Sequence, residues 1–275
     1  MKTILFPTDF SKNAAHASQY AGILAKLYDA NLVFLHVHHV SLVPNDNEFL
    51  IDITSLNEKN AKADLDNFTR QFIKESNLSS ERVTQRVEYG FTSEKIVETA
   101  RSIQADMIVM GTKGASDILD KWLGTHAHEV MKAAECPVFT IPQNAPIDYP
   151  QRILYAADFK EDEISATHKL LVLAKPLAVS CKVVHIHDYF EPNVGHTIEE
   201  TIKELEVKFR NEDITVQQLH RTDIIEGLEG YIKSYKPDVL ALAVHEKSFL
   251  GNIFDTSITR HFIQEGKLPM LTFKK

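Results

Sequence analysis

Three glycines and a threonine stand at spacings that could hold an anion. Two residues separate Gly111 from Gly114, and Gly124 follows nine residues later with Thr125 directly after it. Glycine has no Cβ, so main-chain N–H groups around it can converge on a phosphate. A helix beginning near Thr125 would add free N–H groups and the positive end of its dipole, and Lys113 would add a charge. The pattern favours phosphate binding; the alternative is that the glycines only turn the chain.

The elements around this loop indicate where it lies. An apolar strand precedes the loop and a helix-like stretch follows it. Strands are predicted at 3–7, 31–38, 83–90, 105–111 and 136–141, with helices at 13–30, 58–76, 92–104 and 124–135. Strands that alternate with helices imply a parallel sheet covered on both faces. Ligands bind at the carboxyl ends of such strands, where Pro7-Thr8-Asp9 and the glycine loop both stand.

The chain repeats itself. The segment 4–10 is echoed at 153–159 by a shift of 149 residues, and 105–111 meets 237–243 by a shift of 132. Such constant shifts indicate a duplication in which the second copy lost 17 residues, the difference between 149 and 132. We expect the first copy to carry a longer loop or helix around 41–62.

A proline-rich connection at 142–150 separates the copies, which predicts domains at 1–145 and 150–275.

Composition limits the functions that are open to the chain. The 275 residues carry a formal net charge of -8, which disfavours sequence-independent binding of nucleic acid. The two cysteines, Cys136 and Cys181, form neither a CxxC motif nor a metal-ligand spacing. No apolar run has the length of a signal peptide core or a membrane span. We therefore expect a cytoplasmic protein without a membrane partner.

The sequence resembles the universal stress protein family in its tandem form. The family motif is G-x2-G-x9-G-[S/T], which the four loop residues match, and "ILFPTDFS" and "CPVFTIP" look like the family's first and last strands. The resemblance implies two tandem five-stranded α/β domains of the adenine nucleotide alpha hydrolase-like (Rossmann-like) type. It also implies ATP, with or without Mg²⁺, as the ligand of the first domain. Carried over by position, the ligand-binding residues would be Pro7, Thr8, Asp9, Val37, Gly111, Lys113, Gly114, Gly124 and Thr125.

Some of these residues have other readings. Asp9 could instead be the N-cap of the helix that follows it. Val37, expected to meet adenine through its backbone, could be an ordinary core residue.

The second copy departs from the motif. The shift of 132 replaces the glycines by Ala243, Glu246 and Thr256, and leaves only the hydroxyl of Ser257. Each replacement adds a Cβ where backbone should approach phosphate, and Glu246 adds a charge that repels a polyanion. The acid survives as Asp158. We expect the second domain to be degenerate and not to bind ATP in the family manner.

Histidines offer a possible metal site. His36 and His38 recur as His185 and His187, and residues two apart in a strand face the same side. Each pair could chelate a metal, and His261 could join others in the second copy. We favour the interpretation that the pairs are polar residues at the ligand edge of the sheet, so no metal site is predicted.

We interpret the chain as a nucleotide-dependent regulator in a stress response rather than an enzyme. The last strands of the two domains would pair within the chain to form a pseudo-dimer, two chains could pair into a homodimer, and an unidentified regulatory protein would read the bound state. One alternative is an interaction scaffold without nucleotide. The other is a slow ATPase or autokinase, although no P-loop and no paired acid and base are present in the sequence.

Overall fold

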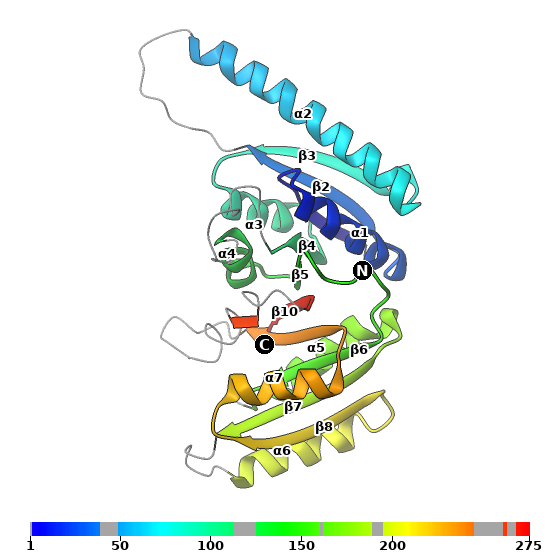
Figure 1. Ribbon diagram of the computed structural model, residues 1–275, viewed down its shortest axis with the longest axis vertical. Helices are drawn as coiled ribbons and strands as arrows, with labels where there is room; N and C mark the ends of the chain where they lie inside the picture. The colour runs from blue at the N-terminus through cyan, green and yellow to red at the C-terminus, as the bar shows by residue number, and fades with distance from the viewer. Residues whose placement is uncertain are drawn as a thin grey trace. The chain divides into compact units, whose positions relative to one another are not determined.

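The computed structural model divides into two compact units, Met1–Ile147 and Asp148–Lys275 (Figure 1). It describes residues 2–38, 49–112, 125–159, 162–188, 195–244, 261–262 and 268–275. Among these residues, no helix is long and apolar enough to cross a membrane.

Unit 1 is built on five parallel strands in the order β3-β2-β1-β4-β5. The strands are β1 (Thr3–Pro7), β2 (Asn31–His38), β3 (Val83–Tyr89), β4 (Met107–Gly111) and β5 (Val138–Ile141). The central strands are apolar along their whole length because helices cover both faces of the sheet. β1 ends at Pro7, as the sequence predicts.

Among the residues that the structure describes, four α-helices cover the sheet of unit 1. They are α1 (Lys12–Leu27), α2 (Phe49–Ser76), α3 (Thr92–Ser102) and α4 (Thr125–Ala133), with a 3-10 turn at Ser80–Arg82. α1 contacts α2, and α3 contacts α4, so each pair shares one face of the sheet (Figure 1). Under α1 and α2 the core is aromatic: Phe34 lies 5.2 Å from Phe6 and 4.9 Å from Phe72 between ring centroids.

Unit 2 repeats this arrangement with five parallel strands in the order β10-β9-β6-β7-β8. The strands are β6 (Arg152–Ala157), β7 (Ser180–Asp188), β8 (Ile214–Arg221), β9 (Val239–Val244) and β10 (Met270–Lys274). The helices are α5 (Glu163–Ala174), α6 (Gly195–Lys208) and α7 (Ile224–Tyr235), with a 3-10 turn at Lys175–Leu177. The fold predicted for both copies is confirmed.

The extra residues of the first copy belong partly to a longer helix. α2 has 28 residues, whereas its counterpart α6 has 14. The lengthening expected around 41–62 therefore includes the first turns of α2, which begins at Phe49.

Candidate functional site

The carboxyl ends of β1 and β4 meet at the centre of the unit 1 sheet. These strands are neighbours, and the chain runs outward from them in opposite directions, to β2 on one side and β5 on the other. In open α/β sheets such a switch point leaves a crevice outside the strand ends, where ligands bind. Pro7 ends one strand and Gly111 the other, so the fold brings these two predicted site residues to one edge.

The turn after β1 is held by its own side chains. The N–H of Phe10 donates to Thr8 Oγ1 at 3.1 Å, and the N–H of Ser11 donates to Asp9 Oδ1 at 3.1 Å. Thr8 is buried and donates its N–H to the Leu35 carbonyl at 2.8 Å, while Asp9 is exposed. The turn thus fixes the Asp9 backbone and leaves its carboxylate at the edge.

Ser11, not Asp9, caps α1. The Ser11 Oγ accepts the N–H of Ala14 at 3.0 Å, which is the bond expected of an N-cap residue. The alternative reading of Asp9 as the N-cap is therefore wrong. Asp9 Oδ1 instead accepts the N–H of the cap residue Ser11, which lies two residues later in the chain.

A histidine from β2 supports the same turn. His36 Nδ1 lies 2.9 Å from the Thr8 carbonyl oxygen, and since a carbonyl can only accept, Nδ1 carries the hydrogen. The His36 ring stacks on Phe10 with a centroid distance of 4.4 Å, and Phe10 has a left-handed φ of 64°. The stack and the hydrogen bond hold a backbone conformation that a bulky residue rarely adopts.

Val37 lies near the carboxyl end of β2. The ladder between β1 and β2 ends at the pair Pro7–Leu35, so Val37 lies beyond it on that side. On its other side Val37 pairs with Glu88 of β3. Its side chain is partly exposed rather than fully buried.

Gly111 is required by a neighbour inside the unit. A Cβ on Gly111 would lie 2.8 Å from Asn13 Nδ2, a distance that real Cβ atoms essentially never show. Asn13 comes from the first turn of α1 and is only 5% exposed. The sequence analysis missed Asn13, although an amide among the small apolar residues of α1 was a visible signal. The group that closely approaches the Gly111 backbone is thus the Asn13 side chain of α1.

The phosphate side of the predicted site falls largely outside the described residues. Lys113, Gly114 and Gly124 are not among them, and only the main chain of Thr125 is, as the first residue of α4. The start of α4 is consistent with the predicted helix.

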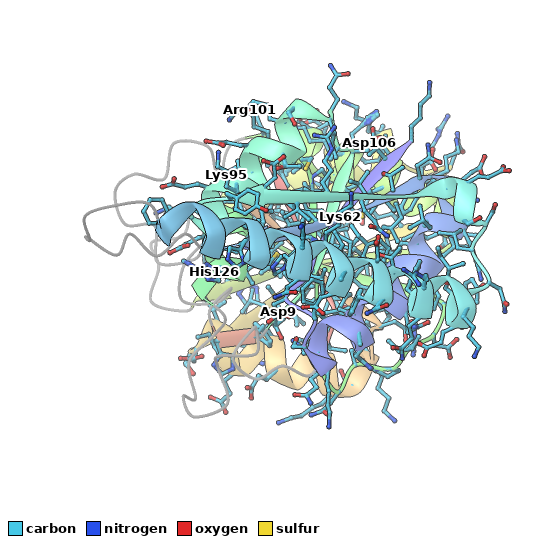
Figure 2. All side chains as sticks on the ribbon, turned by 90° about the horizontal axis from the view of Figure 1, so that it is seen from above. Asp9, Lys62, Lys95, Arg101, Asp106 and His126 are labelled. Atoms are coloured by element: carbon cyan, nitrogen blue, oxygen red, sulfur yellow. The ribbon has the colours of Figure 1, made fainter. Side chains whose placement is uncertain are left out.

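A polar cluster joins the first turns of α3 and α4. Ser93 Oγ lies 2.9 Å from His126 Nδ1, and the same hydroxyl donates to Glu129 Oε2. His126 and Glu129 are more than half exposed. Figure 2 shows His126 on the same side of unit 1 as Lys95 of α3, with Asp9 also labelled. Because the hydroxyl donates to a carboxylate, His126 is not placed as a base toward Ser93.

Unit 2 keeps the supporting contacts of this edge. His185 Nδ1 lies 2.9 Å from the Ala157 carbonyl oxygen, and its ring stacks on Phe159 at 4.7 Å. Phe159 again has a positive φ, of 49°. These contacts give His36 and His185 a structural role at the sheet edge.

No group of three or more His, Cys, Asp or Glu gathers for a metal within the described ranges. His261 instead pairs with Glu229, its Nε2 2.8 Å from Oε1.

The acid of unit 2 has a different neighbourhood from that of unit 1. The ammonium of Lys275 lies 2.5 Å from Asp158 Oδ1 and 2.8 Å from Glu163 Oε2. The Tyr155 hydroxyl donates to Glu163 Oε1 at 2.6 Å. Ala243 stands where unit 1 has Gly111, while Glu246, Thr256 and Ser257 lie outside the described residues.

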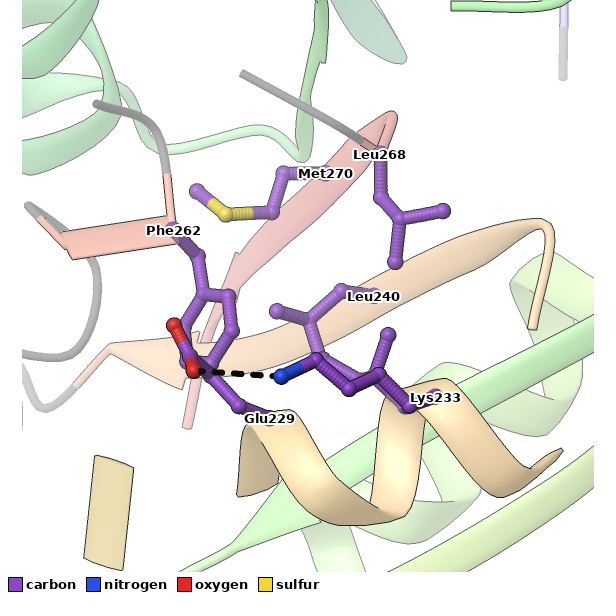
Figure 3. A pocket seen from close by; sticks show the side chains of 7 residues that line it. Glu229, Lys233, Leu240, Phe262, Leu268 and Met270 are labelled. Carbon is purple, nitrogen blue, oxygen red and sulfur yellow. Dashed lines mark ion pairs between the residues drawn. The ribbon is translucent and has the colours of Figure 1, made fainter. Parts of the chain in front are cut away.

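An apolar pocket of unit 2 is too small for a nucleotide. It lies between α7, β9 and β10 and has a volume of about 60 Å³ (Figure 3). Pockets for drug-sized ligands enclose roughly 300–1,000 Å³. Its lining residues are Glu229, Ile232, Lys233, Leu240, Phe262, Leu268 and Met270.

These features define a class of protein with two doubly wound parallel α/β units in one chain. In the first unit, the hydrogen-bonded turn after β1 and Gly111 at the end of β4 lie together at the switch point of the sheet. The model of the universal stress protein family matches residues 1–142. The chain therefore belongs to the universal stress protein family.

Relatives and solved structures agree with this assignment. Universal stress protein MJ0531 of Methanocaldococcus jannaschii is 29% identical over 143 residues, covering 51% of this chain and 81% of the relative. The crystal structure of a universal stress protein from Archaeoglobus fulgidus covers 99% of this chain and 96% of its own, with a TM-score of 0.72 and 16% identity. That likeness shows the two-unit fold. A universal stress protein solved in complex with cAMP is 22% identical, with 52% of this chain and 98% of its own covered and a TM-score of 0.41.

Proposed function

We propose that unit 1 binds an adenine nucleotide, ATP above all, and that the bound state regulates contact with a protein partner during stress. One observation carries the proposal. The exposed Asp9 carboxylate and the glycine exit of β4 stand together at the switch point of the unit 1 sheet. The motif that continues from Gly111 ends where α4 begins.

Each part of the ligand has a matching group in this proposal. Asp9, fixed by the N–H of Ser11, accepts hydroxyls of the ribose. The main chain of Val37, beyond the end of the β1–β2 ladder, meets the adenine edge. The glycine loop and the first turn of α4 hold the phosphates, with Lys113 as a point charge.

The first experiment identifies the ligand and counts it. The purified chain is denatured, and the released small molecules are measured by mass spectrometry against protein concentration. Titration calorimetry then follows ATP, AMP and cAMP, with and without Mg²⁺. About one adenine nucleotide per chain supports the proposal. No released nucleotide together with a flat ATP titration would favour the scaffold function instead.

A substitution taken from unit 2 makes the test specific. Gly114→Glu copies Glu246 and sets a carboxylate against the phosphates. Two like charges about 4 Å apart cost roughly 4 kcal/mol at intermediate dielectric, so we expect ATP to bind at least about a hundredfold more weakly. Asn60→Asp adds the same charge on an exposed position of α2 and should leave the affinity unchanged. Equal affinities for the two variants would contradict the placement of the phosphates.

The proposed function also includes a cellular location, the kinds of partner and the expected rate of ATP turnover. We place the protein in the cytoplasm, without a membrane or nucleic-acid partner, and expect its two units to pair within the chain. Turnover of ATP would require Mg²⁺ and is expected to be absent or slow. A phosphate-release assay at saturating ATP separates a binding protein from an ATPase.

A further inference from the structure

A lysine side chain fills the switch point of unit 2. Lys275 follows β10, and its ammonium contacts Asp158, just after β6, and Glu163, the first residue of α5. The side chains of the three residues are 4%, 11% and 1% exposed, respectively. The contact is therefore a buried ion cluster and not a surface salt bridge.

The ladder between β9 and β10 explains how Lys275 reaches this place. In unit 1 the ladder between β4 and β5 ends at the pair Gly111–Ile141, and the next residue, Pro142, has no N–H to continue it. Unit 2 has Lys274 at that position, which pairs with Val244, and Lys275 then donates its N–H to the Val244 carbonyl at 3.0 Å. Because β10 is one residue longer at this end than β5, Lys275 lies at the switch point of unit 2.

Three residues of this cluster have different residue types at the corresponding positions of unit 1. By the shift of 149 residues, Tyr155 and Glu163 correspond to Phe6 and Ala14, and by the shift of 132 residues Lys275 corresponds to Gln143. Of the residues in this cluster, only the acid has the same type in both units, as Asp9 in unit 1 and Asp158 in unit 2. In unit 1 that acid is exposed, whereas in unit 2 it holds an ammonium of the same chain.

The charges of the cluster keep the lysine in place. Burial by itself would lower the pKa of Lys275, but the facing carboxylates of Glu163 and Asp158 raise it above its ordinary value. The lysine is therefore cationic at neutral pH. Removing it would leave two acids facing each other in a largely dry site.

We propose that Lys275 is an internal ligand of unit 2 that occupies its switch point and excludes adenosine, so that the chain binds nucleotide in unit 1 only. The loss of glycines weakens the phosphate side of unit 2, whereas Lys275 closes its nucleoside side by engaging Asp158. The choice of adenosine as the excluded ligand rests on the function proposed for unit 1.

The test gives unit 2 the residues of unit 1. The triple variant Tyr155→Phe, Glu163→Ala and Lys275→Gln carries the side chains found at Phe6, Ala14 and Gln143, and leaves Asp158 in place. Adenosine is the probe, because it does not need the phosphate loop. Equilibrium dialysis of the full chain counts bound adenosine, and circular dichroism checks the fold. Lys208→Gln, on an exposed position of α6, is the matched control.

The expected result is one additional adenosine per chain in the triple variant relative to the wild type and the control. An unchanged count in the triple variant would overturn the proposal. If the wild type binds none and the variant binds one, the inference about Lys275 stands and the function proposed for unit 1 fails. If both bind none, the inference fails too.

A second, charge-neutral pair of substitutions guards against misfolding of the triple variant. Glu163→Gln with Lys275→Gln removes one negative and one positive charge while keeping side chains of similar length. This variant should gain at least a tenfold higher affinity of unit 2 for adenosine. The same count and affinity as in the wild type would again overturn the proposal.

Discussion

Unit 1 and unit 2 hold the amino ends of their sheets in the same way and the carboxyl ends differently. At the amino edge, Asp106 accepts the N–H groups of Lys2 and Thr3 at 2.7 and 2.9 Å. Its counterpart Asp238 accepts those of Gln151 and Arg152, both at 2.9 Å. Each carboxylate ties the start of the central strand to its neighbour, so this pair of acids serves the fold.

At the carboxyl edge, the histidine contacts are the same in both units, whereas the residues around the acid differ. Both units anchor a histidine on the carbonyl that precedes the turn and stack it on a phenylalanine. Within the described part of the chain, unit 2 alone then adds a tyrosine, a glutamate and a lysine beside its acid. The comparison teaches that an acid retained after duplication can be exposed in one unit and neutralise a buried lysine of its own unit in the other.

The largest effect on stability should come from removing Lys275. Lys275→Met removes the ammonium that contacts the buried carboxylates of Asp158 and Glu163, and breaking a buried ion pair by removing one partner costs about 3–5 kcal/mol. Urea unfolding of the full chain, read separately for each transition, measures the loss. Lys208→Met is the control, and a loss below about 1 kcal/mol for Lys275→Met would show that the cluster does not hold unit 2 together.

The same lysine predicts a dependence on alkaline pH. Its pKa in the folded protein is raised above 10.5, the ordinary value. The stabilisation is therefore fully present below pH 10.5 and is lost as the pH rises through the folded pKa. The difference in unfolding free energy between wild type and Lys275→Met should be constant near neutral pH and shrink in strongly alkaline solution. A difference that grows with pH would contradict this sign.

Gly111 and Asn13 should behave as a coupled pair. Gly111→Ala places a methyl group 2.8 Å from the Asn13 amide, and overpacking of this kind costs about 1–3 kcal/mol. Adding Asn13→Ala should recover most of the loss in thermal unfolding, and a double-mutant cycle gives the coupling. In unit 2, Ala243→Gly should cost less than about 1 kcal/mol. Independent, additive effects in unit 1 would disprove the contact.

The shared histidines should contribute alike in both units. His36→Ala and His185→Ala each remove one hydrogen bond and one ring stack, together worth about 1–2 kcal/mol. Chemical denaturation of the two variants should give similar losses. A large loss in only one unit would mean that the support differs between them, despite the matching distances.

The smallest effect concerns the cysteines. Burial raises the pKa of Cys136 to about 11 and that of Cys181 to about 12. The thiolate is the reactive form, so alkylation by iodoacetamide at pH 7.5 should be slower than for a free cysteine by about a hundredfold at Cys136 and about a thousandfold at Cys181. Mass spectrometry of the labelled chain measures the rate, and the denatured chain is the control. Fast labelling of Cys136 would show that the junction between α4 and β5 opens, and fast labelling of Cys181 would show that the start of β7 opens.

The sequence predicted the architecture well because its signals are local or repeated. Apolar runs mark the central strands, Pro7 ends β1, and the two shifts align the units as the strand registers do. The motif also places Gly111 at the edge where Asp9 stands. The pairing of the two units with each other stays a prediction.

The residues that the sequence did not predict act over long separations. Lys275 meets acids more than a hundred residues earlier in the chain, and only the strand register brings them together. The role of Asn13 depends on its contact with Gly111, which lies about a hundred residues later and comes close only because α1 packs on β4. The capping of α1 was missed for a simpler reason: Ser11 and Asp9 are both good cap residues two positions apart, and only the observed hydrogen bonds separate them.

The stacked histidines also give each unit its own spectroscopic label. An aromatic ring 4.4 or 4.7 Å from an imidazole shifts the imidazole proton resonances upfield through its ring current. His36 and His185 should therefore appear as two displaced signals in the proton NMR spectrum of the unmodified chain. Each signal reports on the turn beside its own acid, so ligand entry at one unit can be followed without any added probe.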